Sequence, residues 1–120
     1  MAVSPGFIDF VVEQLEGCGP IVTKRMFGGV GIYSGDTFFA IIDDDILYLK
    51  TDATTRPDFE REGSEPFRPY GDERSSLHYF SVPVSVLEDA DALCVWGRKA
   101  IAVAAAARTV KPSSKKRRPR

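Results

Sequence analysis

The single histidine of this 120-residue chain, His78, is the first residue whose type could support catalysis. An imidazole can serve as the base that activates a serine or cysteine nucleophile. The candidate nucleophiles are Cys18, Ser81 and Cys94. No acid–base pair accompanies them, and a lone histidine in a strand is more often a satisfied or solvent-facing side chain. The sequence therefore predicts no catalytic residues and no enzyme.

Arginine side chains offer a second kind of chemistry, since guanidinium groups bind carboxylates and phosphates. Arg25, Arg68 and Arg74 could hold an anionic substrate, as could His78. A small enzyme or an anionic-ligand-binding domain that uses these residues is the alternative hypothesis for function.

The consecutive acids Asp43, Asp44 and Asp45 could offer oxygen ligands to Ca²⁺ or Mg²⁺. A calcium loop of the EF-hand type needs spaced acids, a central glycine and a glutamate at its twelfth position, and this stretch has none of these. We interpret the acids as a solvated turn in which Asp44 or Asp45 adopts positive φ. The sequence thus predicts no metal site and no cofactor.

Four glycines crowd the stretch RMFGGVGIYSGD, residues 25–36. A dinucleotide-binding loop requires G-x-G-x-x-G between a strand and a helix. Here a serine takes the place of the third glycine, a hairpin replaces the helix, and no Gly-Lys-Ser/Thr completes a phosphate-binding loop. We therefore interpret Gly28, Gly29 and Gly31 as positions of a bulge or close contact, and Gly35 as the source of positive φ in a turn.

The end of the chain, RTVKPSSKKRRPR (residues 108–120), has seven basic and no acidic side chains. The preceding 107 residues carry nine basic against 17 acidic side chains, a formal charge of −8. Residues 111–120 have no apolar side chain beyond prolines to offset the entropy of ordering. The sequence thus predicts a domain over 1–109 and a disordered tail over 110–120.

Such a tail could solubilise the chain, contact its acidic surface, or bind nucleic acid by neutralising phosphates. Binding of this last kind is expected to be weak and blind to base sequence. The residues that would carry it are Lys111, Lys115, Lys116, Arg117, Arg118 and Arg120.

Periodicity and turn signals predict the elements of the first half. An amphipathic helix is expected over 5–16, where Ser4 can cap and Pro5 fits the first turn. Runs rich in β-branched and aromatic residues predict strands over 21–27, 30–33, 37–42 and 46–51. Because the connections are too short for parallel crossovers, these strands form an antiparallel β-meander.

The second half predicts a short helix over 54–63, an irregular loop over 64–71, a strand over 75–83, a turn, and a long helix over 90–109. The order α-β-β-β-β-α-β-α indicates an α+β fold, with about five antiparallel strands and helices packed on one face. The core is expected to include Met26, Phe27, Val30, Ile32, Phe39, Ile41, Leu47, Leu49 and Trp96.

The composition, 43% hydrophobic and 28% charged, is typical of a soluble globular domain. No apolar run is long enough to span a membrane, and the N-terminus does not read as a secretory signal, which predicts a cytoplasmic protein without a membrane partner. Cys18 and Cys94 are too few and too far apart for a disulfide scaffold or a Cys-x-x-Cys site, and we expect reduced thiols.

The aromatic residues Phe38, Phe39, Tyr48, Tyr79 and Phe80 could suggest a sheet that stacks nucleic-acid bases. The sequence signature of such sheets is absent, and an acidic domain is a poor partner for phosphates. We interpret these rings as core and sheet-face packing. In the run ILYLK, alternation predicts that Tyr48 and Lys50 face water while Leu47 and Leu49 face the core.

Four stretches resemble the N-terminal domain of the TfoX/Sxy family of bacterial competence regulators: RMFGGVGIY, FFAIIDDDILYLKTD, RPDFEREGSEPFRPYG and LHYFSVPVSVLEDADALCVWGRKA. The resemblance covers roughly residues 5–107 and implies an α+β fold like that of secretion chaperones. The matching motif residues, for which the family implies structural roles, are Met26, Phe27, Gly28, Gly29, Gly31, Tyr33, Leu47, Tyr48, Leu49, Lys50 and Trp96.

The resemblance implies regulation and supplies no catalytic residues. Full-length members join this domain to a second one and act with the cyclic-AMP receptor protein to switch on DNA-uptake genes. This chain carries only the basic tail in that place, like a free-standing single-domain member. We therefore expect a non-catalytic binding or regulatory module that acts through another protein. The sequence leaves the oligomeric state open, and a homodimer is one option.

Overall fold

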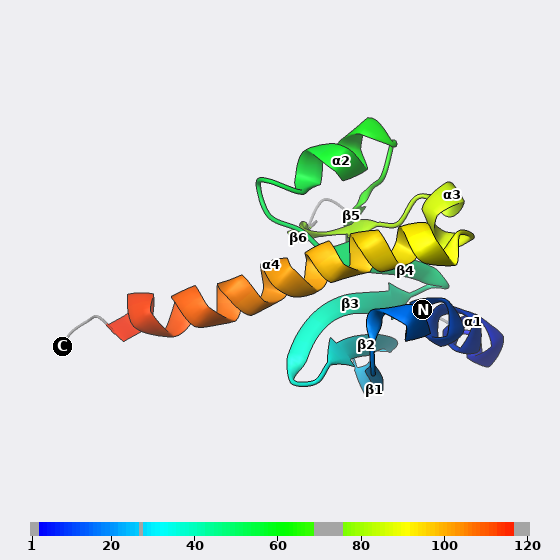
Figure 1. Ribbon diagram of the computed structural model, residues 1–120, viewed down its shortest axis with the longest axis horizontal. Coiled ribbons are helices and arrows are strands. Elements are labelled where there is room, and N and C mark those ends of the chain that lie inside the picture. Colours follow the sequence, from blue (N-terminus) through cyan, green and yellow to red (C-terminus); the bar gives the residue numbers. More distant parts are fainter. Residues whose placement is uncertain (1–2, 27, 69–75, 117–120) are drawn as a thin grey trace.

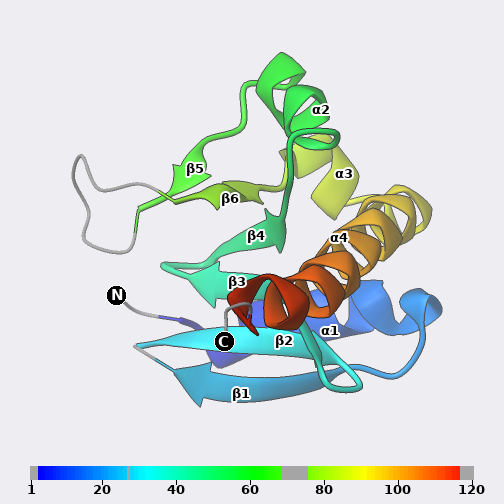
Figure 2. The ribbon, with the colours of Figure 1, turned by 90° about the vertical axis from the view of Figure 1, so that its left-hand side faces the viewer.

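An antiparallel sheet forms one layer of the molecule, and the helices lie together on one side of it (Figures 1 and 2). This computed structural model describes residues 3–26, 28–68 and 76–116. The helices are α1 (Pro5–Leu15), the 3₁₀ turn η1 (Glu16–Cys18), α2 (Arg56–Arg61), α3 (Val84–Leu87) and α4 (Ala90–Lys116). The strands are β1 (Val22–Met26), β2 (Gly29–Ser34), β3 (Thr37–Asp43), β4 (Ile46–Lys50), β5 (Pro66–Phe67) and β6 (Ser76–Ser81). The predicted α+β class is confirmed.

The strands lie in the order β1-β2-β3-β4-β6-β5, and every neighbouring pair is antiparallel. The predicted meander is confirmed for β1 to β4, and the strand predicted over 75–83 is β6, which pairs with β4 through Leu49 and Phe80. The register between β2 and β3 shifts between Ile32 and Tyr33. This shift leaves Phe39 as an extra residue, so both it and Ala40 reach the buried side.

Residues with positive φ lie in the second and third hairpin turns of the meander. Gly35 has a φ of 60° in the turn between β2 and β3, and Asp44 and Asp45 have φ of 54° and 56° in the next turn. The Asp45 carboxylate also accepts hydrogen bonds from the backbone N–H (2.7 Å) and the hydroxyl (2.5 Å) of Ser4. Ser4 is the N-cap residue of α1, but its side chain is committed to this turn and does not cap the helix.

The core lies between the sheet and the helices α1, α4 and α2 (Figure 2). Of the predicted core residues, Val30, Ile32, Phe39, Leu47 and Leu49 are buried, as expected. Trp96 is partly buried against this core, and Phe27 lies outside the described residues. Met26 and Ile41 are half-buried, because they alternate with core residues and face the other side of the sheet. Buried residues that the prediction omitted include Val11, Leu15, Ile42, Phe59, Phe80 and Leu93.

Two segments predicted as irregular form short regular elements. In the loop expected over 64–71, Pro66–Phe67 makes the two-residue strand β5, because β6 offers it an unpaired edge. In the turn expected after β6, Val84–Leu87 forms the single-turn helix α3, which buries Val86. These elements depend on tertiary pairing and packing rather than on local propensity.

The long helix α4 is predicted to end at 109, and it continues to Lys116 instead. Residues 110–116 of the segment expected to be disordered therefore have a helical backbone. The alanine-rich part of α4 favours propagation of the helix, and lysine is a good helix former. Pro112 lies within the extension and has no backbone N–H to donate, so the helix passes it with one hydrogen bond fewer. The helix extends beyond the sheet at its C-terminal end (Figure 1).

Candidate functional site

In the described part of the chain, no helix covers the second face of the sheet, and this face carries two groups of aromatic side chains. Because neighbouring residues of a strand point to opposite faces, the partners of the buried core residues project away from the helices. On the central strands these are Tyr33, Phe38, Ile41, Tyr48 and Tyr79, all half-buried. We call this surface the open face.

The rings on the open face contact one another in two groups. The rings of Tyr33 and Phe38 lie 5.1 Å apart between centroids, and those of Phe38 and Tyr79 lie 5.9 Å apart. Tyr48 makes an edge contact of 4.9 Å with Phe67 of β5. The described residues thus place aromatic side chains on five neighbouring strands, which follow the sheet order β2-β3-β4-β6-β5. Sequence reasoning missed Phe67, because its pairing beside β6 was not predicted.

Two lysines lie over the outer rings of the first group. The ammonium nitrogen of Lys24 is 5.2 Å from the ring centroid of Tyr33, and that of Lys50 is 5.1 Å from the centroid of Tyr79. Each contact is of the kind that contributes about 0.5–1 kcal/mol at an exposed site. The prediction that Lys50 points away from the core is confirmed, whereas nothing in the sequence singled out Lys24.

Glycine at position 31 allows the open face to pack closely. A Cβ there would lie 2.6 Å from the Met26 methyl carbon and 2.9 Å from the Phe38 ring. Gly29 has a different neighbour, because its Cβ would lie 2.5 Å from the backbone oxygen of Ile42. At Gly29 and Gly31, an added Cβ would come too close to neighbouring atoms. At Gly28 the reason is the backbone, because a φ of 82° is a conformation that residues with a side chain rarely adopt.

The electrostatic character of the open face changes along the strands. Burial raises the pKa of Tyr79 to about 12, and the neighbouring Tyr33 adds to the rise. Burial also raises the pKa of Tyr48, with further contributions from Asp43, Asp44 and Glu65. Both phenols are therefore neutral hydrogen-bonding groups at physiological pH. The face is flanked by lysines at the Tyr33 and Tyr79 end and by carboxylates at the Tyr48 end.

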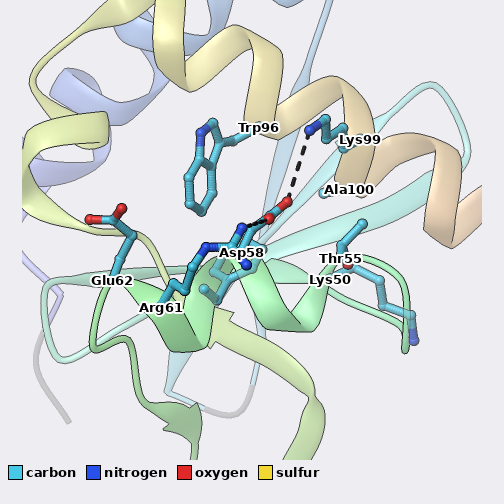
Figure 3. Close-up of a pocket in the computed structure, with 9 residues that line it drawn as sticks. Lys50, Thr55, Asp58, Arg61, Glu62, Trp96, Lys99 and Ala100 are labelled. Atoms are coloured by element: carbon cyan, nitrogen blue, oxygen red, sulfur yellow. Dashed lines mark hydrogen bonds and ion pairs between the residues drawn. The ribbon is translucent and has the colours of Figure 1, made fainter.

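A first cavity, of about 230 Å³, lies between α2 and α4 on the other side of the sheet (Figure 3). Phe59 packs edge-on against Trp96 at 4.7 Å between ring centroids and forms the apolar wall. Asp58 pairs with Arg61 and lies 4.0 Å from the Lys99 ammonium. Because these charged side chains pair with one another, we interpret the cavity as a gap in the packing between α2 and α4.

A second cavity, of about 450 Å³, brings His78 together with Lys50, Arg56 and Asp52 beside α4. Asp52 is already occupied, because its Oδ1 accepts hydrogen bonds from the backbone N–H groups of Thr54 and Thr55. The hydrogen bond from the Thr54 hydroxyl and these two backbone hydrogen bonds hold the pKa of Asp52 below its usual value. None of the three candidate nucleophiles lines this cavity.

The arginines considered for an anion site are not brought together. Arg25 lies on β1, at one edge of the sheet, and Arg68 follows β5, at the opposite edge. Five strand intervals of about 4.8 Å separate these edges by about 24 Å. Arg68 forms an ion pair with Glu65 at 3.1 Å, and Arg74 lies outside the described residues. The expected arginine group is therefore wrong as a single site.

The two cysteines, far apart in the chain, lie together where η1 packs on α4, and both are free thiols. Burial raises the pKa of Cys18 to about 12, and its hydrogen bond with Cys94 adds to the rise. Gly17 leaves room at this junction, since a Cβ there would lie 3.0 Å from the Cys94 sulfur, whereas a Cβ at Gly97 would make only ordinary contacts with Cys18 and Leu15. The arrangement keeps the Cys18 thiol protonated, and a protonated thiol is a poor nucleophile.

Among residues 3–26, 28–68 and 76–116, no cluster of three histidine, cysteine or acidic side chains could hold a metal ion. The same part of the chain contains no helix with the length and apolar character needed to cross a membrane. Side chains of the proposed nucleic-acid residues lie outside the description: Lys111, Lys115, Lys116, Arg117, Arg118 and Arg120.

Comparison with known families adds one finding. The family model of the TfoX N-terminal domain matches residues 13–104. This range includes η1, the whole sheet, and the part of α4 that packs against the core and ends at Ala104. A search of the curated proteins gave no match.

Proposed function

This chain belongs to the TfoX N-terminal domain family, a regulatory family, and we propose that it is a non-catalytic cytoplasmic domain that acts by binding another protein. The proposed process is regulation related to competence, in which the domain contributes a binding surface and no chemistry. The family membership supports the regulatory role, and the open face supports the mode of action.

The observation that carries this proposal is the aromatic and cationic open face. Tyr33, Phe38 and Tyr79 offer rings that are half-buried by one another, with neutral phenols and two lysines at their margins. Tyrosine is enriched in protein interfaces because it combines apolar area with a hydrogen-bonding group. A partner that covered these rings would bury apolar area and would place its own groups beside the ammonium groups of Lys24 and Lys50.

A protein partner suits this surface better than a nucleic acid does. Carboxylates of Asp43, Asp44 and Glu65 influence the Tyr48 end of the same face. Phosphates that followed the rings across the sheet would meet these like charges. A protein can instead place its own cations and anions opposite the two ends.

Affinity capture from the native host tests this proposal, with matched variants of the bait. The double variant Tyr33→Ser, Tyr79→Ser removes two rings from the open face, and Arg61→Ser is a control on α2. We expect the parent and the control to retain the same protein, and the double variant to lose it while keeping a cooperative melting transition. Capture that is equal for all three baits would show that the open face is not the binding surface.

A genetic experiment tests the regulatory role. Deletion of the gene is expected to change transcript levels of DNA-uptake genes, and complementation with the parent chain should restore them. Complementation with Tyr33→Ser, Tyr79→Ser should not. If the transcripts are the same in all strains, the proposed connection with competence is wrong.

We also propose a weaker second activity, sequence-blind binding of nucleic acid by the basic residues of 108–120. The supporting observation is the density of charge, seven basic and no acidic side chains in 13 residues. The position of α4 also supports it, since the backbone of this helix extends beyond the sheet as far as Lys116 (Figure 1). Such contacts would hold nucleic acid near the domain without reading its bases.

A further inference from the structure

We propose that the exposed edge of β1 accepts an extended, acidic strand of the partner protein, which joins the sheet beside Val22–Met26. The inference rests on the proposed function, because it names the segment by which the partner is recognised. Strand addition of this kind draws its affinity from main-chain hydrogen bonds and its specificity from side chains.

The place of β1 in the sheet provides the main-chain part of the argument. The strand is the terminal member of the order β1-β2-β3-β4-β6-β5 and pairs only with β2 among the described residues (Figure 2). Its first four residues are exposed and Met26 is half-buried. An edge strand presents alternate N–H and C=O groups outward. The opposite edge, β5, has two residues and offers little for a strand to pair with.

The charges on β1 select the kind of strand. Lys24 and Arg25 are the only basic residues among the first 49 of the chain, which contain seven acidic ones. Their register, with Lys24 opposite Gly31 and Arg25 opposite Val30, directs them to different faces of the sheet. A partner strand with two adjacent acidic residues can therefore place one carboxylate beside each cation.

The same charges disfavour a second copy of this chain at the edge. Antiparallel pairing of β1 with itself, centred near Lys24, places Lys24 and Arg25 of one copy beside those of the other. Like charges directly opposite each other destabilise a strand pair, whereas opposite charges contribute about 0.2–1 kcal/mol for each pair. The basic end of the chain is disfavoured there for the same reason.

Lys24 also connects the edge with the open face, because its ammonium group lies over the Tyr33 ring. A strand added at β1 extends the open face by one more row of side chains beyond β1, whose residue Val22 lies opposite Tyr33. The strand and the rings then form one continuous surface for the partner.

Blocked peptides test this inference directly. The probes are the sequence TVEEVT, its charge-reversed form TVKKVT, and TPEEPT, in which prolines remove two main-chain donors. We expect TVEEVT alone to bind, measured by fluorescence anisotropy, and to slow hydrogen exchange of backbone amides within Val22–Met26. Raising the salt concentration should weaken binding, because the carboxylate pairs are exposed.

Charge reversal of the protein gives the matched control. The variant Lys24→Glu, Arg25→Glu should bind TVEEVT about tenfold more weakly, from two lost charge pairs, and should bind TVKKVT instead. Arg61→Glu should bind TVEEVT like the parent. The inference is overturned if TVEEVT does not bind at millimolar concentration, if TPEEPT or TVKKVT binds the parent equally well, or if the protected amides lie elsewhere.

The result of the peptide experiment can be told apart from the result of the affinity capture that tests the proposed function. Loss of the captured protein with Tyr33→Ser, Tyr79→Ser, together with failure of TVEEVT to bind, leaves the open face as a binding surface and removes the β1 strand site. Equal capture by all baits removes the open-face proposal, while the peptide experiment still decides whether β1 accepts a strand.

Discussion

At the scale of single residues, the glycines of the second strand decide how closely the sheet can pack. Gly29 and Gly31 are not in the left-handed region of backbone conformation, so their role is to leave room. Gly31 leaves room for side chains of the open face, and Gly29 leaves room for the backbone of β3. The two positions should therefore tolerate a methyl group to different degrees, because a side chain can move more readily than a strand.

Gly29→Ala is expected to destabilise the domain by about 1–3 kcal/mol, the usual cost of forcing extra atoms into a packed site. The cause is the 2.5 Å distance from the new Cβ to the backbone oxygen of Ile42. Urea unfolding measures the change. Gly6→Ala is the control, because nothing lies within 4 Å of its Cβ in α1, and it should leave stability unchanged or slightly higher. Equal effects for both variants would contradict the steric role of Gly29.

The half-buried thiol of Cys18 leads to a prediction about reactivity. Its pKa, raised to about 12 by burial and by the hydrogen bond with Cys94, keeps it protonated far above neutral pH. At pH 8 a free cysteine thiol is about one quarter ionised, and a thiol with a pKa of about 12 is ionised to about one part in ten thousand. Alkylation of Cys18 by iodoacetamide in the native protein should therefore be about a thousandfold slower than that of free cysteine.

Mass spectrometry of the peptide that contains Cys18 measures this rate as a function of time and pH. The rate should keep rising between pH 9 and 11, where alkylation of a free thiol already levels off, because only the thiolate reacts. Urea-unfolded protein is the control and should react like free cysteine. A rate for the native protein at pH 8 close to that of free cysteine would show that the thiol is not held protonated.

At the scale of elements, β4 shows how alternation along a strand separates the core from the open face. Leu47 and Leu49 are buried among helix-side residues, whereas Tyr48 and Lys50 belong to the open face. Ile46, at the start of the strand, keeps 39% of its surface exposed. Neighbouring positions of one strand therefore have different energetic roles.

Leu47→Ala is expected to destabilise the domain by about 2–5 kcal/mol, because it deletes buried methyl groups and leaves a cavity. Ile46→Ala removes a side chain of the same size from a position that keeps 39% of its surface exposed, and its cost should be clearly smaller, about 1 kcal/mol. Thermal and urea unfolding of the two variants compare these costs. If Ile46→Ala destabilises as strongly as Leu47→Ala, then the side of the sheet that holds the core has been assigned wrongly.

At the scale of the whole molecule, the acidic domain and the basic end of the chain are separate in charge and in position. The packing of α4 against the core reaches Ala104, which is 4% exposed, and the basic segment begins at Arg108. Removal of residues 108–120 should therefore leave the melting temperature unchanged and abolish binding of nucleic acid. With about five phosphate contacts, the slope of log K against log salt for the full chain should be about −4.

Binding of a random-sequence DNA duplex by the full and the truncated chain measures this effect, with salt as the variable. A Lys24→Glu, Arg25→Glu variant of the full chain serves as a control, and it should bind the duplex like the parent. If the truncated chain binds as well as the full chain, the contact must lie on the domain, and the tail proposal is wrong.

The amino-acid sequence by itself determined the elements and their class. Local rules sufficed for this, because hydrophobic period, turn residues and short connections specify helices, strands and antiparallel neighbours. Positive φ at Gly35, Asp44 and Asp45 follows from their turns, and the alternation along β4 follows from strand geometry. The MFGG and LYLKTD stretches likewise indicated the family.

Only the tertiary structure decided which residues meet. The sequence could not place Arg25 and Arg68 at opposite edges, bring Cys18 to Cys94, or set Phe67 against Tyr48, because these distances depend on strand order and on how helices cross the sheet. It predicted helices on one face of the sheet, but it could not show which aromatic side chains contact one another on the other face. Non-local contacts of this kind are fixed when the whole core is buried, and no short stretch of sequence contains that information.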